Sequence, residues 1–138
     1  MTNKLVLADT TVWIHFLRGA GTAVRETLAP LIVSDRLATA PVIVMELLCG
    51  AKAQKDFDQL QEDLAALRCL ETTPEIWAEA SRLAFTLRRK GLTVPLTDTL
   101  IATHALHHDA LLLHDDRHYD MIAAVTRLKH TWLKPGPA

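Results

Sequence analysis

The sequence predicts an α/β fold with a short, mainly parallel central sheet. Residues 4–8 and 110–113 are continuously apolar rather than alternating, which is typical of strands buried on both faces. Between such runs lie longer segments whose apolar residues recur at helical spacing. Strands that alternate with helices form a parallel sheet with helices packed on both of its faces.

The elements follow from these patterns in chain order. We expect strands at 4–8, 37–39, 69–71, 110–113 and 126–133, and helices at 12–18, 21–33, 42–49, 54–67, 74–90, 98–107 and 121–125. Prolines 41 and 74 suit the first turn of a helix, and glycines 19, 50 and 91 suit the position after a helix ends. The predicted N-caps are threonines: Thr10 or Thr11, Thr72 and Thr97.

The length and composition describe a globular protein. The 138 residues fit one domain, which we expect at 1–134, with a loose tail at 135–138. A net charge of -1 argues against a simple basic nucleic-acid-binding module, although an acidic site neutralised by a metal can still approach phosphate. No signal peptide or membrane-spanning run is visible, and the two cysteines form no disulfide or zinc pattern, so we expect a cytoplasmic protein.

Acidic residues interrupt or end four apolar segments. Asp9 and the pair Asp115–Asp116 each end an apolar run, Glu46 interrupts another, and Asp98 lies in the expected first turn of a helix. Acids in apolar surroundings are costly unless they are paired, hydrogen-bonded or bound to a metal. Helix capping and buried acceptor roles explain each acid singly. Four such places in one small domain indicate a shared cation.

The ligand type indicates which cation and which chemistry. Carboxylates from four separate segments, without a cysteine or an obligatory histidine, favour Mg²⁺ or Mn²⁺ over Zn²⁺. One or two such ions activate a water and stabilise an in-line phosphoryl displacement. Phosphodiester hydrolysis is therefore the reaction class that these residues predict.

Four segments resemble the PIN-domain ribonucleases, and most closely the VapC-type toxins of bacterial toxin–antitoxin pairs. The segments are 7–14, 40–51, 96–102 and 112–119, which occur in family order and span nearly the whole chain. The resemblance implies a PIN-like three-layer α/β/α fold. It also implies a metal-dependent endoribonuclease that uses Mg²⁺ or Mn²⁺, forms a homodimer, and is silenced by a cognate VapB-type antitoxin whose C-terminal segment covers the site.

The resemblance also implies roles for single residues. The acidic metal site would comprise Asp9, Glu46, Asp98 and Asp116. Thr11 would be a polar neighbour that orients an acid or a water, and Asp116 is preferred to Asp115 because its spacing to Tyr119 matches the family pattern. At His114 the sequence departs from the family, which often has a small hydroxyl residue there.

Several residues keep two interpretations. Thr97, Asp115 and Arg117 are supporting candidates, and Arg117 either contacts a substrate phosphate or pairs with a neighbouring acid. The run 88–90, Arg-Arg-Lys, either follows an RNA backbone or complements a helix C-terminus, and the second is favoured. His104 and His108 are one helical turn apart, but no third zinc ligand is evident near this 104–108 cluster.

Two other functions compete with the nuclease. A Mg²⁺-dependent phospho-acceptor of the receiver type is also a small α/β domain, but it requires a lysine beyond a late strand and gives Glu46 no role. An inactive PIN-like interaction scaffold is the other alternative, and retention of all four acids opposes it. The sequence does not name the RNA or the bond that is cleaved.

Overall fold

The computed structural model describes residues 4–19 and 21–136, in which every strand pairing is parallel. The strands are β1 (Val6–Ala8), β2 (Leu37–Thr39), β3 (Arg68–Cys69), β4 (Leu111–His114) and β5 (His130–Trp132). The helices are α1 (Thr10–Leu17), α2 (Thr22–Val33), α3 (Pro41–Cys49), α4 (Gln54–Ala65), α5 (Pro74–Arg89), α6 (Leu96–His107) and α7 (Arg117–Ala123). The predicted α/β class and parallel sheet are confirmed.

The sheet has the strand order β3-β2-β1-β4-β5, with β1 at its centre. After β1 the chain moves outward to β2 and β3, and it then returns to the other side of β1 to form β4 and β5. Strand order therefore reverses between β1 and β4. In open parallel sheets, ligands bind at the carboxyl ends of the strands at such a switch point.

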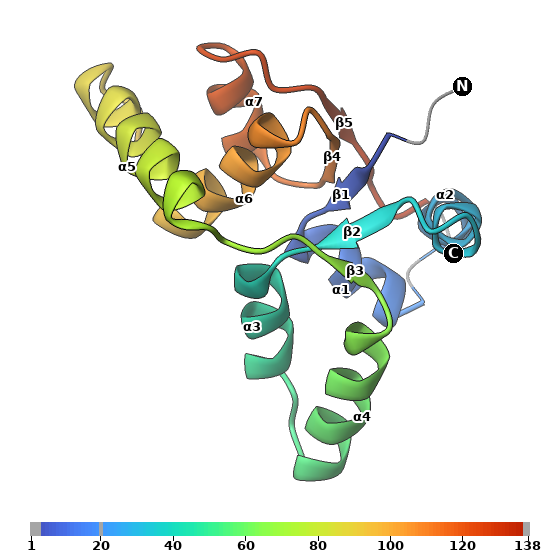
Figure 1. Ribbon diagram of the computed structural model, residues 1–138. Coiled ribbons are helices and arrows are strands. Elements are labelled where there is room, and N and C mark those ends of the chain that lie inside the picture. Colours follow the sequence, from blue (N-terminus) through green and yellow to red (C-terminus); the bar gives the residue numbers. More distant parts are fainter. Residues whose placement is uncertain (1–3, 20, 137–138) are drawn as a thin grey trace.

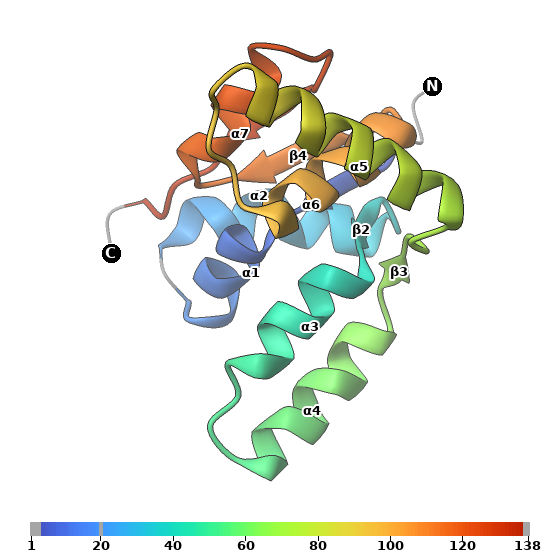
Figure 2. The same cartoon turned by 90° about the vertical axis from the view of Figure 1, so that its left-hand side faces the viewer.

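Helices cover both faces of the sheet, as the three-layer prediction requires. Figure 1 shows α5, α6 and α7 on one side of the sheet and α2 on the other. Helices α3 and α4 form a hairpin that projects away from the sheet, which is clearest in Figure 2. No helix among the described residues is long and apolar enough to cross a membrane.

The core lies on both faces of the central strands. All three residues of β1 and of β2 are buried, which fits the continuous apolar run predicted for β1. Large side chains that are fully buried come from the strands and from the inner faces of helices on both sides, and they include Leu7, Leu28, Ile101, Leu112 and Ile122.

Three predicted helix caps were wrong. Asp9 caps α1 through a hydrogen bond from Val12 N, so the acid that ends β1 also starts the next helix. Thr73 rather than Thr72 caps α5, and Pro95 rather than Thr97 precedes α6. Thr97 is the second residue of α6, while Asp98 lies in its first turn as expected.

The C-terminal region also differs from the prediction. Helix α7 begins at Arg117, four residues before the expected start, because Asp116 caps it. Strand β5 is shorter than the expected strand 126–133 and lies at the edge of the sheet. Trp77 on α5 is 55% exposed.

One close contact ties the end of the described chain to α2. A Cβ atom at Gly21, where φ is +83°, would lie 2.7 Å from the backbone nitrogen of Gly136. Only glycine fits this approach without displacing the backbone. Within the expected loose tail at 135–138, Gly136 therefore lies against the start of α2, and residues 137–138 are outside the described part of the chain.

Candidate active site

The switch point of the sheet brings the predicted acids together. The backbone N–H of Asp9, just past β1, donates to the carbonyl oxygen of Leu113 at 3.0 Å, which fixes the end of β1 beside the end of β4. Asp115 and Asp116 directly follow β4. Asp98 approaches from the first turn of α6. Acids that lie far apart in the sequence therefore meet at one edge.

Asp9 is the most buried of these acids, with 2% of its surface exposed. Its Oδ1 accepts hydrogen bonds from Thr11 Oγ1 at 2.5 Å and from Val12 N at 3.2 Å. Burial nevertheless raises the pKa of Asp9 to about 7, because these hydrogen bonds offset only part of the lost hydration. Asp9 is thus held in place with its charge only partly compensated.

Asp98 and Asp116 meet around the imidazole of His118. The Nδ1 atom of His118 lies 3.0 Å from Asp98 Oδ2 and 2.9 Å from Asp116 Oδ1. This nitrogen is buried, and neither contact has hydrogen-bond geometry. One ligand atom from each of the three residues lies within 4.8 Å of the other two, which is close enough for a shared metal ion.

The carboxylates at this edge repel one another. Burial raises the pKa of Asp98, the neighbouring Asp116 and Glu46 raise it further, and His118 offsets part of the effect. Among the described residues, no lysine or arginine forms an ion pair with Asp9, Glu46, Asp98 or Asp116. The edge therefore has an excess of negative charge without a basic side chain to balance it.

Glu46 reaches the same edge from the hairpin of α3 and α4. It is partly buried within α3, and its Oε1 accepts a hydrogen bond from Thr10 Oγ1 at 2.6 Å. Glu46 and Asp9 lie outside the tight group of Asp98, Asp116 and His118. Thr10 and Thr11, the first two residues of α1, therefore each hold one acid in position.

The supporting candidates have different surroundings. Asp115 accepts hydrogen bonds from Trp132 Nε1 at 2.6 Å and contacts His15 Nε2 at 2.7 Å, so its carboxylate already has two partners. Although burial acts in the other direction, these bonds lower the pKa of Asp115. The backbone N–H of Asp115 donates to Thr11 Oγ1 at 2.9 Å, which links it to Asp9.

Thr97 and Arg117 contribute less to this arrangement. Thr97 is a partly buried residue in the first turn of α6, next to Asp98. Arg117 is exposed, and the ion pairs of the described residues do not include it, so it pairs with neither Asp115 nor Asp116.

Sequence reasoning missed His118 and understated Tyr119. Tyr119 is fully buried, and its hydroxyl donates to Asp98 Oδ1 at 3.4 Å. Burial and the carboxylates of Asp9 and Asp98 raise the pKa of Tyr119, so this hydroxyl stays protonated. The available signal was position: both residues lie in the first turn of the helix that Asp116 caps, where side chains turn back toward the cap.

This arrangement fits a divalent cation. The donors are mainly carboxylate oxygens, and they come from four elements that converge on one edge. A buried imidazole nitrogen without a hydrogen bond lies between two of them. A cation would relieve both the mutual repulsion of the acids and the cost of burying Asp9.

The other histidines do not form the zinc site that was weighed for residues 104–108. His104 is fully buried and its Nε2 is 2.9 Å from Thr72 Oγ1, whereas His107 pairs with Glu79 at 2.7 Å. The second group with metal-ligand spacing in the described part of the chain is His114, Asp120 and His130. Its two imidazoles already hydrogen-bond each other at 2.9 Å.

Comparisons with known proteins identify the family of this chain. Residues 6–125 match the PIN domain family. The VapC ribonuclease Mb1587 of Mycobacterium bovis is 30% identical over 129 residues, which cover 91% of this chain and 96% of that protein. Ribonuclease VapC21 of Mycobacterium tuberculosis is 32% identical over 122 residues, which cover 84% of this chain and 87% of that protein.

Solved structures with the same fold include structures of VapBC and FitAcB. VapBC2 from Rickettsia felis, bound to a DNA fragment from its promoter, aligns with a TM-score of 0.80 at 18% identity and covers 94% of this chain and 99% of that chain. FitAcB from Neisseria gonorrhoeae aligns with a TM-score of 0.74 at 20% identity and covers 95% of this chain and 98% of that chain. At these identities the likeness concerns the fold alone.

Proposed function

The chain belongs to the PIN-domain family, within the VapC ribonucleases, and on this premise we propose that it is a Mg²⁺- or Mn²⁺-dependent endoribonuclease, the toxin of a toxin–antitoxin pair. The observation that supports this most is the uncompensated acidic edge at the switch point between β1 and β4. The substrate is RNA, and a cytoplasmic location goes with that substrate.

Asp9, Glu46, Asp98 and Asp116 would hold the metal. When bound, a divalent cation lowers the pKa of a water and stabilises the negative charge that develops on the scissile phosphate. The chain's own residues set the geometry. Thr11 and Val12 N fix the Asp9 carboxylate, Thr10 fixes that of Glu46, and the cap bond from His118 N fixes that of Asp116.

Thr11 has the central positioning role. Its hydroxyl donates to Asp9 and accepts from the backbone of Asp115, so one side chain links the ends of β1 and β4. The buried hydroxyl of Tyr119 donates a hydrogen bond to Asp98. Because the pKa of Tyr119 is raised, this hydroxyl stays protonated and does not act as a base. The acids therefore need little rearrangement when substrate arrives.

A VapB-type antitoxin is the proposed inhibitory partner. A groove of about 470 Å³ runs between α1, α3 and α4, and Ile14, Leu17, Leu47, Leu60 and Glu46 line it. Leu17 is 49% exposed there. A peptide that lies in this groove reaches Glu46, and therefore the acidic edge, without a change in the fold. Undiminished RNA cleavage in the presence of a bound antitoxin would contradict this.

A homodimer is proposed from an apolar face on α3, α5 and α6. Met45, Trp77 and Leu96 are 62%, 55% and 68% exposed on this face. They line a depression of about 300 Å³ with few polar groups. An exposed apolar patch of this kind marks an interaction surface, and two copies related by a two-fold axis would bury it. A light-scattering mass of one chain would contradict the dimer.

The test is cleavage of a total RNA pool by the purified protein with Mg²⁺, Mn²⁺ or EDTA. We expect discrete fragments that require the metal, and a loss of rate of about 100-fold or more in Asp98→Asn. Asp58→Asn is the matched control, because Asp58 is an exposed acid on α4 whose partner in the structure is Gln54. Equal rates in both variants would exclude Asp98 from the chemistry.

Failure of the wild-type protein to cleave any RNA would favour the scaffold alternative. The protein would first be freed of any antitoxin under denaturing conditions and refolded, with its fold checked by circular dichroism. Membership in the nuclease family disfavours the phospho-acceptor alternative.

A further inference from the structure

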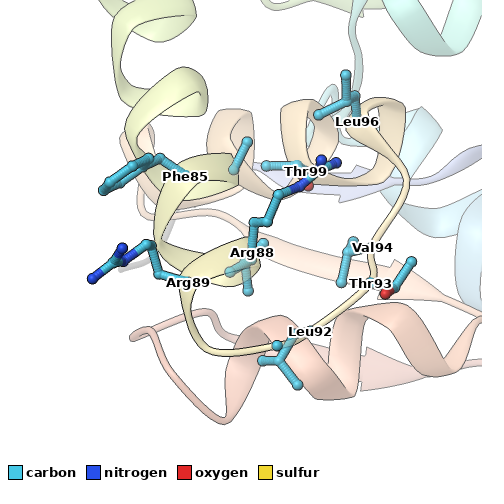
Figure 3. Close-up of a pocket in the computed structure, with 11 residues that line it drawn as sticks. Phe85, Arg88, Arg89, Leu92, Thr93, Val94, Leu96 and Thr99 are labelled. Carbon is cyan, nitrogen blue, oxygen red and sulfur yellow. The ribbon is translucent and has the colours of Figure 1, made fainter.

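A further pocket lies where α5 ends and α6 begins, and the first turn of α6 also carries Asp98. Figure 3 shows that the connection between these helices arches away from them and leaves a hollow, into which Arg88 extends toward Thr99, whereas Phe85 and Arg89 extend from the other side of α5. The pocket has a volume of about 410 Å³, within the range of about 300–1,000 Å³ that is usual for small-ligand sites. We call it the α5–α6 pocket; its main lining residues are Phe85, Arg88, Arg89, Val94, Leu96 and Thr99.

The rim of this pocket combines basic and aromatic side chains. Arg88 and Arg89 are exposed, and the ion pairs of the described residues include neither of them. Phe85 is 67% exposed, and the guanidinium carbon of Arg89 lies 5.9 Å from the centre of its ring. Unpaired guanidinium groups favour phosphate, and an exposed ring beside them favours a base.

The pocket and the acidic edge share one helical turn. Leu96 and Thr99 of α6 line the pocket, and Asp98 from the same turn faces Asp116 and His118. One turn of helix rises about 5.4 Å. Because Asp98 lies on another face of this turn than Leu96 and Thr99, an RNA strand that crosses the start of α6 can contact both the pocket and the acids.

We propose that the α5–α6 pocket is a nucleotide subsite for the RNA substrate, in which Arg88 binds a backbone phosphate, while Phe85 on the outer side of α5 stacks on the base of an adjacent nucleotide. This inference rests on the proposed function. The subsite sets which phosphodiester bond is presented to Asp98, because a nucleotide held in the pocket fixes the register of the strand.

Cations at the end of α5 also complement the helix C-terminus, which was the favoured interpretation of residues 88–90. That role explains the charges but neither the pocket nor the exposed ring of Phe85. The two interpretations differ in one measurable way: a helix-terminal role predicts an effect on stability, and a subsite predicts an effect on RNA affinity and its salt dependence.

The first experiment measures binding rather than cleavage. The probe is a fluorescein-labelled single-stranded RNA 12-mer of mixed sequence, titrated with Asp98→Asn protein at several salt concentrations. Adding Arg88→Gln should weaken binding about fivefold to tenfold and reduce the slope of log affinity against log salt by about 0.7, the value for one phosphate contact on a single strand. Phe85→Leu should weaken binding by a similar factor with the slope unchanged, because stacking releases no counterions.

Arg82→Gln is the matched control, because Arg82 is an exposed arginine on the same helix that does not line the pocket. Equal affinities for Arg88→Gln and Arg82→Gln would overturn the subsite. So would an Arg88→Gln protein whose altered binding follows a change in oligomeric mass measured by light scattering.

A second measurement does not depend on how the Arg88 and Phe85 variants fold. RNA that contains 4-thiouridine is crosslinked to Asp98→Asn protein with otherwise unchanged residues, and the crosslinked peptides are identified by mass spectrometry. We expect crosslinks in the peptides around Phe85 and Val94, and crosslinks confined to other elements would overturn the subsite. Wild-type protein that neither cleaves nor binds RNA would instead refute the proposed function itself.

Discussion

Two sets of buried ionisable residues lie in this fold, and they differ in how their polarity is compensated. His114 and His130 hydrogen-bond each other at 2.9 Å and stack, and His104 contacts Thr72 through Nε2, while its Nδ1 is buried without a hydrogen-bond partner. Burial lowers the pKa of His104 to about 4 and also lowers that of His114, so both are neutral at pH 7. The acids at the switch point have raised pKa values and repel one another.

The difference teaches which buried groups are structural and which await a ligand. A neutral imidazole is satisfied when one ring nitrogen accepts a hydrogen bond and the other donates one, and His114 is an example. Its Nδ1 accepts from Asp116 N at 3.3 Å, which leaves Nε2 as the donor to His130. A lone pair at Nε2 is what a metal would need, so this pair is a hydrogen-bonded structural unit rather than a second metal centre.

The largest expected effect concerns Asp9 in metal-free protein. Its folded pKa of about 7 lies above the ordinary value of 3.8, so the protonated form stabilises the fold. That contribution is complete below pH 4 and is lost as the pH rises through 7, up to about 4 kcal/mol. Urea unfolding in EDTA should show this loss between about pH 4 and 7, and Asp9→Asn should remove most of it.

Asp98 contributes a smaller decrease of the unfolding free energy with rising pH, because its pKa is also raised. A double variant, Asp9→Asn with Asp98→Asn, should therefore be the flattest of the series. Equal pH slopes in wild-type protein and Asp9→Asn would show that Asp9 is not the strained acid of this site.

The next effect has the opposite direction and belongs to His104. Its folded pKa of about 4 lies below the ordinary value of 6.5, so the neutral form stabilises the fold. This contribution is present above pH 6.5 and is lost as the pH falls through 4, up to about 3 kcal/mol. His104→Leu should flatten stability between pH 6.5 and 4 without changing RNA cleavage at pH 7.

His107→Leu on the same helix is the control for His104. His107 is more exposed and pairs with Glu79. Its replacement should therefore leave the pH dependence of the unfolding free energy between pH 6.5 and 4 unchanged. If His104→Leu loses as much unfolding free energy between pH 6.5 and 4 as wild-type protein, other groups cause that loss, and His114 is the first to examine.

The smallest of the three effects is stabilisation by the cation. Mn²⁺ at about 100 times its dissociation constant should raise the free energy of unfolding by about 2.7 kcal/mol. Differential scanning calorimetry should show a higher Tm in wild-type protein and no shift in Asp98→Asn. A Tm shift that persists in Asp98→Asn but is lost in His130→Ala would show that Mn²⁺ binds at the group of His114, Asp120 and His130 rather than at the acidic edge.

Much of this architecture was predictable because it depends on local patterns. The buried strands β1 and β4 come from continuous apolar runs, and α6 was placed to within about two residues by its apolar content and by Asp98. The errors concern caps and faces. Asp9 and Asp116 both cap helices while belonging to the acidic edge, and a sequence pattern does not show that one carboxylate serves both purposes.

The sequence by itself determined the fold class, the family and the residues Asp9, Glu46, Asp98 and Asp116 as candidates, because these depend on residue type and spacing along the chain. The tertiary structure decided which candidates lie closest and what surrounds them. It placed His118 between Asp98 and Asp116, and it placed the Asp115 carboxylate in contact with His15 and Trp132. Those choices depend on strand order and on packing between residues up to 100 positions apart, where burial and neighbouring charge set the properties of each acid.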